Sequence, residues 1–212
     1  MKIKKTSKIT SLLLLFFVLP VLVQGAEKIP GKYKDLPGAS RQVVKDSIEV
    51  VEFMSFYCGH CFAMFKNEPM LKGRYPHKLK FKYVPIQWGK APTTPAEAFL
   101  IARDMGKGDE MRHAIFTAAF EQKKDIGSAV VLGELAKKIG LANEFNKRLA
   151  SGEKRAEVEN NMALTRKLRI EATPTVIMAG NIVVSPMQTG GKMIPMMQNL
   201  DMIISGLLKG KK

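Results

Sequence analysis

Two cysteines in the segment Cys58-Gly59-His60-Cys61 are the only cysteines of this 212-residue chain, and their spacing has a specific chemical meaning. They follow the apolar run 50–56, so a strand is expected to end and a helix to begin at this pair. A Cys-x-x-Cys in that position is typical of thiol–disulfide exchange. A structural zinc site needs about four ligands, and a structural disulfide across so short a loop would constrain little chain. The sequence therefore favours redox chemistry.

The two cysteines are expected to have different roles. Cys58 falls at the predicted N-terminus of a helix, where free N–H groups and the helix dipole favour a thiolate and lower its pKa. Cys61 lies about one turn inside the helix and is expected to be shielded, which suits a resolving thiol. Gly59 and His60 are expected to tune the pair, His60 by placing a positive or donor group near Cys58.

Three further positions are candidates because of where they occur. Glu52 interrupts an apolar strand, and a buried carboxylate must be paired or protonated. Lys82 on the next predicted strand is a possible partner, and such an acid near the dithiol can carry protons. The alternative is that Glu52 points to solvent. Thr173-Pro174 precedes another predicted strand, where the peptide bond can be cis or trans.

The elements that must position these residues form two β-containing ends around a helical block. From about 95 to 167 the sequence predicts five helices separated by glycines, with Ser128 as an N-cap. The other expectations are a glycine- and proline-rich extended lead-in over 26–40, strands within 43–56 and over 79–84, a helix after Cys58 that Pro69 kinks or ends, a hairpin over 175–184 and a helix over 193–208. This order predicts one α/β domain with a helical insertion.

The first 25 residues have the pattern of a secretory signal peptide, with four early lysines and an apolar run over 12–23. An uncleaved anchor is the alternative. Export would place the dithiol where disulfides persist. Cleavage would reduce the net charge from +15 to +15 − 4 = +11. Because the remaining lysines are scattered, a solvated basic surface is favoured over nucleic-acid binding.

The methionines of the last predicted helix allow a second interpretation of the chain. Met193, Met196, Met197 and Met202, together with the cysteines and His60, could bind Cu(I) in an exported carrier. The same helical spacing is what a packed apolar face requires. The sequence favours packing, and no metal site is expected.

The segment from Phe53 to Cys61 resembles the DsbA family of periplasmic thiol:disulfide oxidoreductases. The resemblance extends through Lys82-Tyr83, the helical block and Thr173-Pro174-Thr175. It implies a thioredoxin fold with an inserted α-helical domain and no cofactor. The thioredoxin-like domain would comprise 26–92 and 168–212, and the insertion 93–167.

The resemblance also implies roles for individual residues and partners. Pro174 would be a cis-proline facing the dithiol, and Glu52 and Lys82 would match a buried acidic and basic residue beneath it. Reduced or unfolded exported proteins would be substrates in the periplasm, and a DsbB-like membrane oxidoreductase would restore the disulfide. Gly59-His60 is similar to protein disulfide isomerase and Thr173 to the DsbC and DsbG isomerases, so an isomerase or reductase is the alternative on the same scaffold.

Overall fold

A five-stranded mixed sheet forms the centre of the computed structural model, which describes residues 29–209 except 43, 45 and 142. The strand order is β1-β5-β4-β2-β3, and only β2 and β3 run parallel. The strands are β1 (Lys34–Asp35), β2 (Ile48–Met54), β3 (Leu79–Pro85), β4 (Thr175–Met178) and β5 (Ile182–Val184). The central strands β2 and β4 therefore come from distant parts of the chain.

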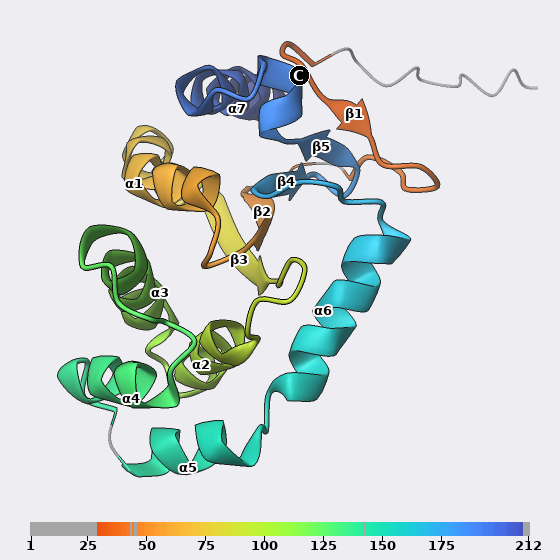
Figure 1. The fold of residues 1–212 in the computed structure, drawn as a ribbon. Coiled ribbons are helices and arrows are strands. Elements are labelled where there is room, and N and C mark those ends of the chain that lie inside the picture. The colour runs from red at the N-terminus through yellow and green to blue at the C-terminus, as the bar shows by residue number, and fades with distance from the viewer. Residues whose placement is uncertain (1–28, 43, 45, 142, 210–212) are drawn as a thin grey trace, which may run out of the picture.

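Helices cover both faces of this sheet (Figure 1). On one face, α1 (Gly59–Arg74) and α7 (Met193–Lys209) pack together over Ile48 and Val50 of β2. On the other face, α6 (Arg155–Lys167) and the segment after it contribute to a smaller core with Phe53 and Ile177. This arrangement confirms the predicted α/β architecture and places the start of α1 at the carboxyl end of β2.

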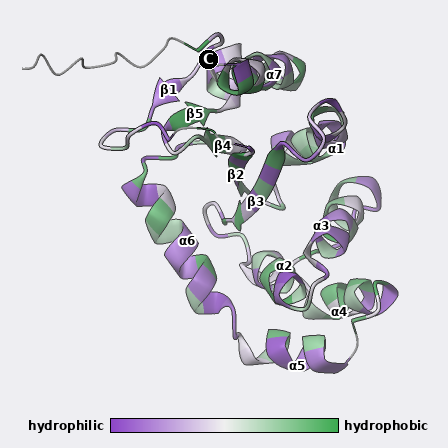
Figure 2. Cartoon of the chain, turned by 180° about the vertical axis from the view of Figure 1, so that it is seen from behind, coloured by the Kyte–Doolittle hydropathy of each residue, from purple (hydrophilic) through white to green (hydrophobic). Residues whose placement is uncertain are grey.

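The chain between β3 and β4 is helical, as predicted. It contains α2 (Thr94–Asp104), α3 (Gly108–Phe116), the π-helical turn η1 (Thr117–Glu121), α4 (Ala129–Lys138), α5 (Asn143–Ser151) and α6. Residues 95–102 of α2 are all buried, and Figure 2 shows α2 as a largely hydrophobic helix among its neighbours. Ser128 accepts a hydrogen bond from the N–H of Val131, which confirms the predicted N-cap of α4.

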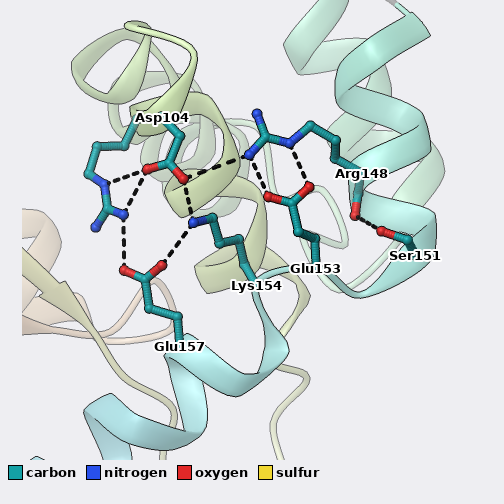
Figure 3. A network of polar contacts seen from close by, with 7 residues as sticks. Asp104, Arg148, Ser151, Glu153, Lys154 and Glu157 are labelled. Carbon is teal, nitrogen blue, oxygen red and sulfur yellow. Dashed lines mark hydrogen bonds and ion pairs between the residues drawn. The ribbon is translucent and has the colours of Figure 1, made fainter.

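Charged side chains join the end of α2 to the connection between α5 and α6 (Figure 3). Asp104 pairs with Lys154 and with Arg103, and Glu157 pairs with both of those cations. Arg148 pairs with Glu153 of the same connection. These groups are half-buried or exposed, so the pairs contribute little to stability, and their main effect is to hold the turn before α6.

Three local expectations need correction or comment. Helix α1 does not end at Pro69 but continues to Arg74, because Leu71 is buried in the core and holds the last turn. The lead-in over 26–40 is not only extended loop, since its strand β1 pairs with β5. The predicted signal peptide lies outside the described residues. Within the described part of the chain, no helix is long and apolar enough to cross a membrane.

Candidate redox site

Cys58 and Cys61 lie where β2 passes into α1, as the sequence predicted. Cys58 is the N-cap of α1 with extended backbone, and it is partly buried, whereas Cys61 in the first turn is fully buried. The N–H of Ser55 donates to the Cys61 Sγ at 3.4 Å. Both cysteines are present as free thiols. One sulfur is thus accessible to another protein and the other is enclosed.

The surroundings move the pKa values of the two thiols in opposite directions. The pKa of Cys58 falls from 9.0 to about 5, chiefly because Cys61 donates a hydrogen bond to its sulfur, and burial opposes this fall. The Thr173 side chain and the backbone N–H groups of Cys61 and His60 contribute to the same fall. Burial raises the pKa of Cys61 well above its ordinary value. At neutral pH, Cys58 is a thiolate and Cys61 is a thiol that donates to it.

The Thr173-Pro174 loop reaches the dithiol and contains a cis peptide bond. The Cys58 Sγ lies 3.2 Å from the carbonyl oxygen of Thr173. On the other side, the indole Nε1–H of Trp88 donates to the Thr173 Oγ1 at 3.1 Å. Trp88 is the only tryptophan of the chain and is partly exposed. Its place at the site could not be predicted from the sequence, because only the fold brings the β3–α2 connection beside this loop.

The imidazole of His60 contacts the segment before α7. Its Nε2 lies 3.1 Å from the carbonyl oxygen of Gly191, before α7, and it must be the donor because a carbonyl only accepts. The donor that His60 supplies to Cys58 is its backbone N–H. Gly59 is exposed, and a side chain there would meet Phe120 only at ordinary contact distance, so packing does not require glycine.

Glu52 is buried, with only 1% of its surface exposed, which excludes the outward-pointing alternative. Burial raises the pKa of its carboxyl to about 8, so it is mostly protonated at neutral pH. Lys82 is not its partner. In the parallel pairing of β2 and β3, Glu52 faces Tyr83, while Lys82 points to the opposite face and forms an ion pair with Glu49. Lys82 is exposed there, because alternate residues of a strand point to opposite sides.

A buried ion pair that was not predicted from the sequence acts on Glu52. Glu68 of α1 accepts two hydrogen bonds from Arg112 of α3, at 2.9 and 3.0 Å, and a third from the Tyr83 hydroxyl at 2.6 Å. Both charged side chains are at most 5% exposed. A signal was present: Cys61, Met64, Glu68 and Leu71 follow the spacing of one helix face, so Glu68 occupies a buried position.

The methionines of α7 mainly pack, as predicted. Met196 and Met197 are buried in the core between α7 and the sheet, whereas Met202 is exposed. In the described part of the chain, no cluster of His, Cys, Asp and Glu is arranged to hold a metal ion. The residues proposed for Cu(I) are thus divided between the core and the surface.

Comparison with known proteins agrees with this geometry. Residues 49–201 match the model of the family described as DSBA-like thioredoxin domain. A protein of Bordetella pertussis named thiol:disulfide interchange protein DsbA is 25% identical over 189 residues, covering 85% of each chain. The protein of the same name from Azotobacter vinelandii is 25% identical over 154 residues, covering 72% of each.

Solved structures have the same fold. The oxidoreductase DsbA from Xylella fastidiosa superposes with a TM-score of 0.66 at 24% identity, covering 82% of this chain and 94% of that one. Pseudomonas aeruginosa DsbA gives 0.66 at 19% identity, covering 82% and 91%. The likeness supports a thioredoxin fold with inserted helices, and the family match spans both the dithiol and the cis-proline loop.

Proposed function

This chain belongs to the family of DSBA-like thioredoxin domains, and on that premise we propose that it is a thiol:disulfide oxidoreductase that donates a disulfide to other proteins. Cys58 is the exchanging sulfur and Cys61 the resolving one. The main support is the contrast between the two thiols, with the pKa of Cys58 at about 5 and that of Cys61 raised. A low pKa stabilises the reduced form and makes the disulfide oxidising.

The reaction starts from the Cys58–Cys61 disulfide. A substrate thiolate attacks the Cys58 sulfur, the Cys58–Cys61 bond breaks, and Cys61 leaves with the electron pair and takes up a proton. A second substrate thiolate then attacks the substrate sulfur of the mixed disulfide, and Cys58 leaves as a thiolate. Because the pKa of Cys58 is low, it is the better leaving group in this second step. The substrate loses two electrons and the dithiol gains them.

The loop at Thr173-Pro174 is proposed to position the substrate. Its carbonyl oxygen at Thr173 lies beside the Cys58 Sγ. Two aromatic rings are exposed close by: Tyr57 precedes Cys58 in the chain, and Trp88 donates a hydrogen bond to Thr173. Extended, unfolded segments can pair with such a loop through their backbone and contact the apolar rings. This favours reduced, unfolded proteins as substrates.

The setting of the activity is part of the proposal. Cleavage of residues 1–25 would release the protein into the periplasm, and a DsbB-like membrane oxidoreductase would restore the disulfide. The redox domain would comprise 26–92 and 168–212, and the helical insertion 93–167. Neither the isomerase or reductase alternative nor the Cu(I) carrier is favoured, since the curated relatives are named thiol:disulfide interchange proteins.

The test is stoichiometric disulfide transfer. The oxidised protein is mixed with a reduced, unfolded ribonuclease, and the thiols of both proteins are counted with time. We expect one disulfide to be transferred per chain, none with Cys58→Ser, and a trapped mixed disulfide from reduced Cys61→Ser with a disulfide-bonded substrate. The control is the redox equilibrium of each protein with glutathione. If this protein keeps its disulfide in a glutathione buffer that is too reducing to oxidise the ribonuclease, its disulfide is the more stable one. The reductase alternative then replaces the oxidase.

A further inference from the structure

Glu52 and Glu68 are two buried carboxyl groups that act on each other, and their surroundings differ. Glu68 has its oxygens satisfied by Arg112 and Tyr83. The Oε2 atom of Glu52 is buried and has no hydrogen-bond partner. The Arg112 pair lowers the pKa of Glu68, although burial opposes it, while burial raises that of Glu52. One carboxyl is therefore a permanent anion and the other holds a proton that it can release.

The cation of this cluster comes from the helical insertion. Arg112 lies on α3, with its guanidinium carbon 3.8 Å from the ring centroid of Tyr83 and 5.1 Å from that of Phe65. Two hydrogen bonds and two aromatic rings thus hold its charge in place. Such a pair is weak evidence for stability, because burying two charges costs about as much as their attraction returns. A positional role explains it better.

The charges that act on Glu52 come from every element packed against it. Burial is the largest cause of the raised pKa of Glu52. The anion of Glu68 raises this pKa next, Arg112 lowers it, and Cys58 raises it. Lys72 of α1, which also pairs with Glu68 at 2.5 Å, lowers it. Tyr83 is its neighbour on β3 and stays protonated, and Cys61 is the buried thiol whose pKa Glu52 in turn raises.

We propose that Glu68 and Arg112 are positioning residues that together keep Glu52 in the form needed to exchange a proton with Cys61. This inference rests on the proposed function. When a substrate thiolate attacks Cys58 and the disulfide breaks, the Cys61 thiolate takes the proton of Glu52, which becomes a carboxylate. In the reverse step, Cys61 returns the proton to Glu52 as it attacks Cys58. The helical insertion thus sets the proton chemistry of the redox domain through Arg112.

The test uses Glu68→Gln, which keeps an oxygen for Tyr83 but removes the anion. The Glu52 carboxyl is titrated by NMR in the full chain labelled with ¹³C-glutamate, and its signal is assigned by its loss in Glu52→Gln. We expect the midpoint of Glu52 to fall by about one pH unit, because Arg112 then acts on it unopposed. The pH above which disulfide transfer slows should fall equally.

Two further variants make the result specific. In Glu68→Gln/Arg112→Met both charges are absent, so the midpoint should return toward that of the wild type. Lys66→Met is the matched control, since Lys66 pairs with Glu121 at 3.2 Å and also joins α1 to the insertion, but at the surface. The inference is overturned if Glu68→Gln shifts Glu52 no more than Lys66→Met, or if the double variant shifts it as far as the single one. Failure of the proposed function appears instead as no disulfide transfer by the wild type, and it leaves the titration of Glu52 unaffected.

Discussion

The low pKa of Cys58 predicts that the relative stability of the reduced and oxidised forms changes with pH. The pKa falls from 9.0 to about 5 on folding. At pH 7 the folded thiol is ionised and the unfolded one is protonated, so about two of these four units contribute, which corresponds to about 2.7 kcal/mol. Because Cys58 is only partly buried, solvent screening reduces this to about 2 kcal/mol.

The disulfide stabilises the oxidised form by a similar amount. Closing a loop of only about four residues restricts the unfolded chain by roughly 2 kcal/mol. The two forms should therefore be about equally stable near pH 7. Since the pKa of Cys58 is depressed in the folded state, its contribution is complete above about pH 9 and is lost as pH falls through about 5. The raised pKa of Cys61 has the opposite effect on the stability of the reduced form, but only when the pH exceeds the ordinary thiol pKa of 9.0.

The measurement is urea unfolding of both forms at pH 5, 7 and 9, followed by far-ultraviolet circular dichroism. The unfolding free energy of the reduced form minus that of the oxidised form should rise by about 3 kcal/mol from pH 5 to pH 9. Taking this difference cancels most of the effect of Glu52, whose pKa is raised chiefly by burial. Reduced wild type should gain the same amount over Cys58→Ser. A difference that does not change with pH would refute the thiolate argument.

Three other variants test separate parts of the site and its support. Thr173→Val removes a hydrogen bond to Cys58, so the alkylation midpoint of Cys58 should rise, and Trp88 fluorescence should change because its acceptor is lost; an unchanged midpoint would count against this contact. Phe116→Ala leaves a cavity among aromatic rings at the interface of α3 with α1, so the free energy of urea unfolding should fall by about 3–5 kcal/mol. A fall below about 1 kcal/mol would be inconsistent with that packing. Lys82→Met should leave the Cys58 midpoint unchanged, since Lys82 is exposed on the other face of the sheet, and a clear shift would show that the face assignment is wrong.

The parts of the fold that the sequence predicted well depend on local signals. The Cys pair after an apolar run predicted the strand-to-helix junction, and Ser128 predicted a helix start. The turn at Ala179-Gly180 predicted the β4–β5 hairpin, and both residues have positive φ there, which glycine adopts without cost. In each case the residues that determine the structure are neighbours in the chain.

Predictions that needed the register between strands were less successful. Lys82 was a reasonable partner for Glu52 by type and by predicted strand, but a strand has two faces and one residue of register decides between them. The structure pairs Glu52 with Tyr83 and Val51 with Lys82. The alternation of Leu79, Phe81 and Tyr83 marks the inner face of β3 and could have excluded Lys82 before the register was known.

The ion pair of Glu68 and Arg112 leaves a partial signal in the sequence. Glu68 falls on the buried face of α1, and Arg112 lies between Met111 and Ile115 on the buried face of α3. A charged residue at a buried helical position requires a partner of opposite charge, because an isolated buried charge is too costly. Among the buried residues of the described chain, Arg112 is the only cation, so it is the natural partner for a buried acid. Which of the buried acids it serves depends on how the insertion packs on α1, and that is tertiary information.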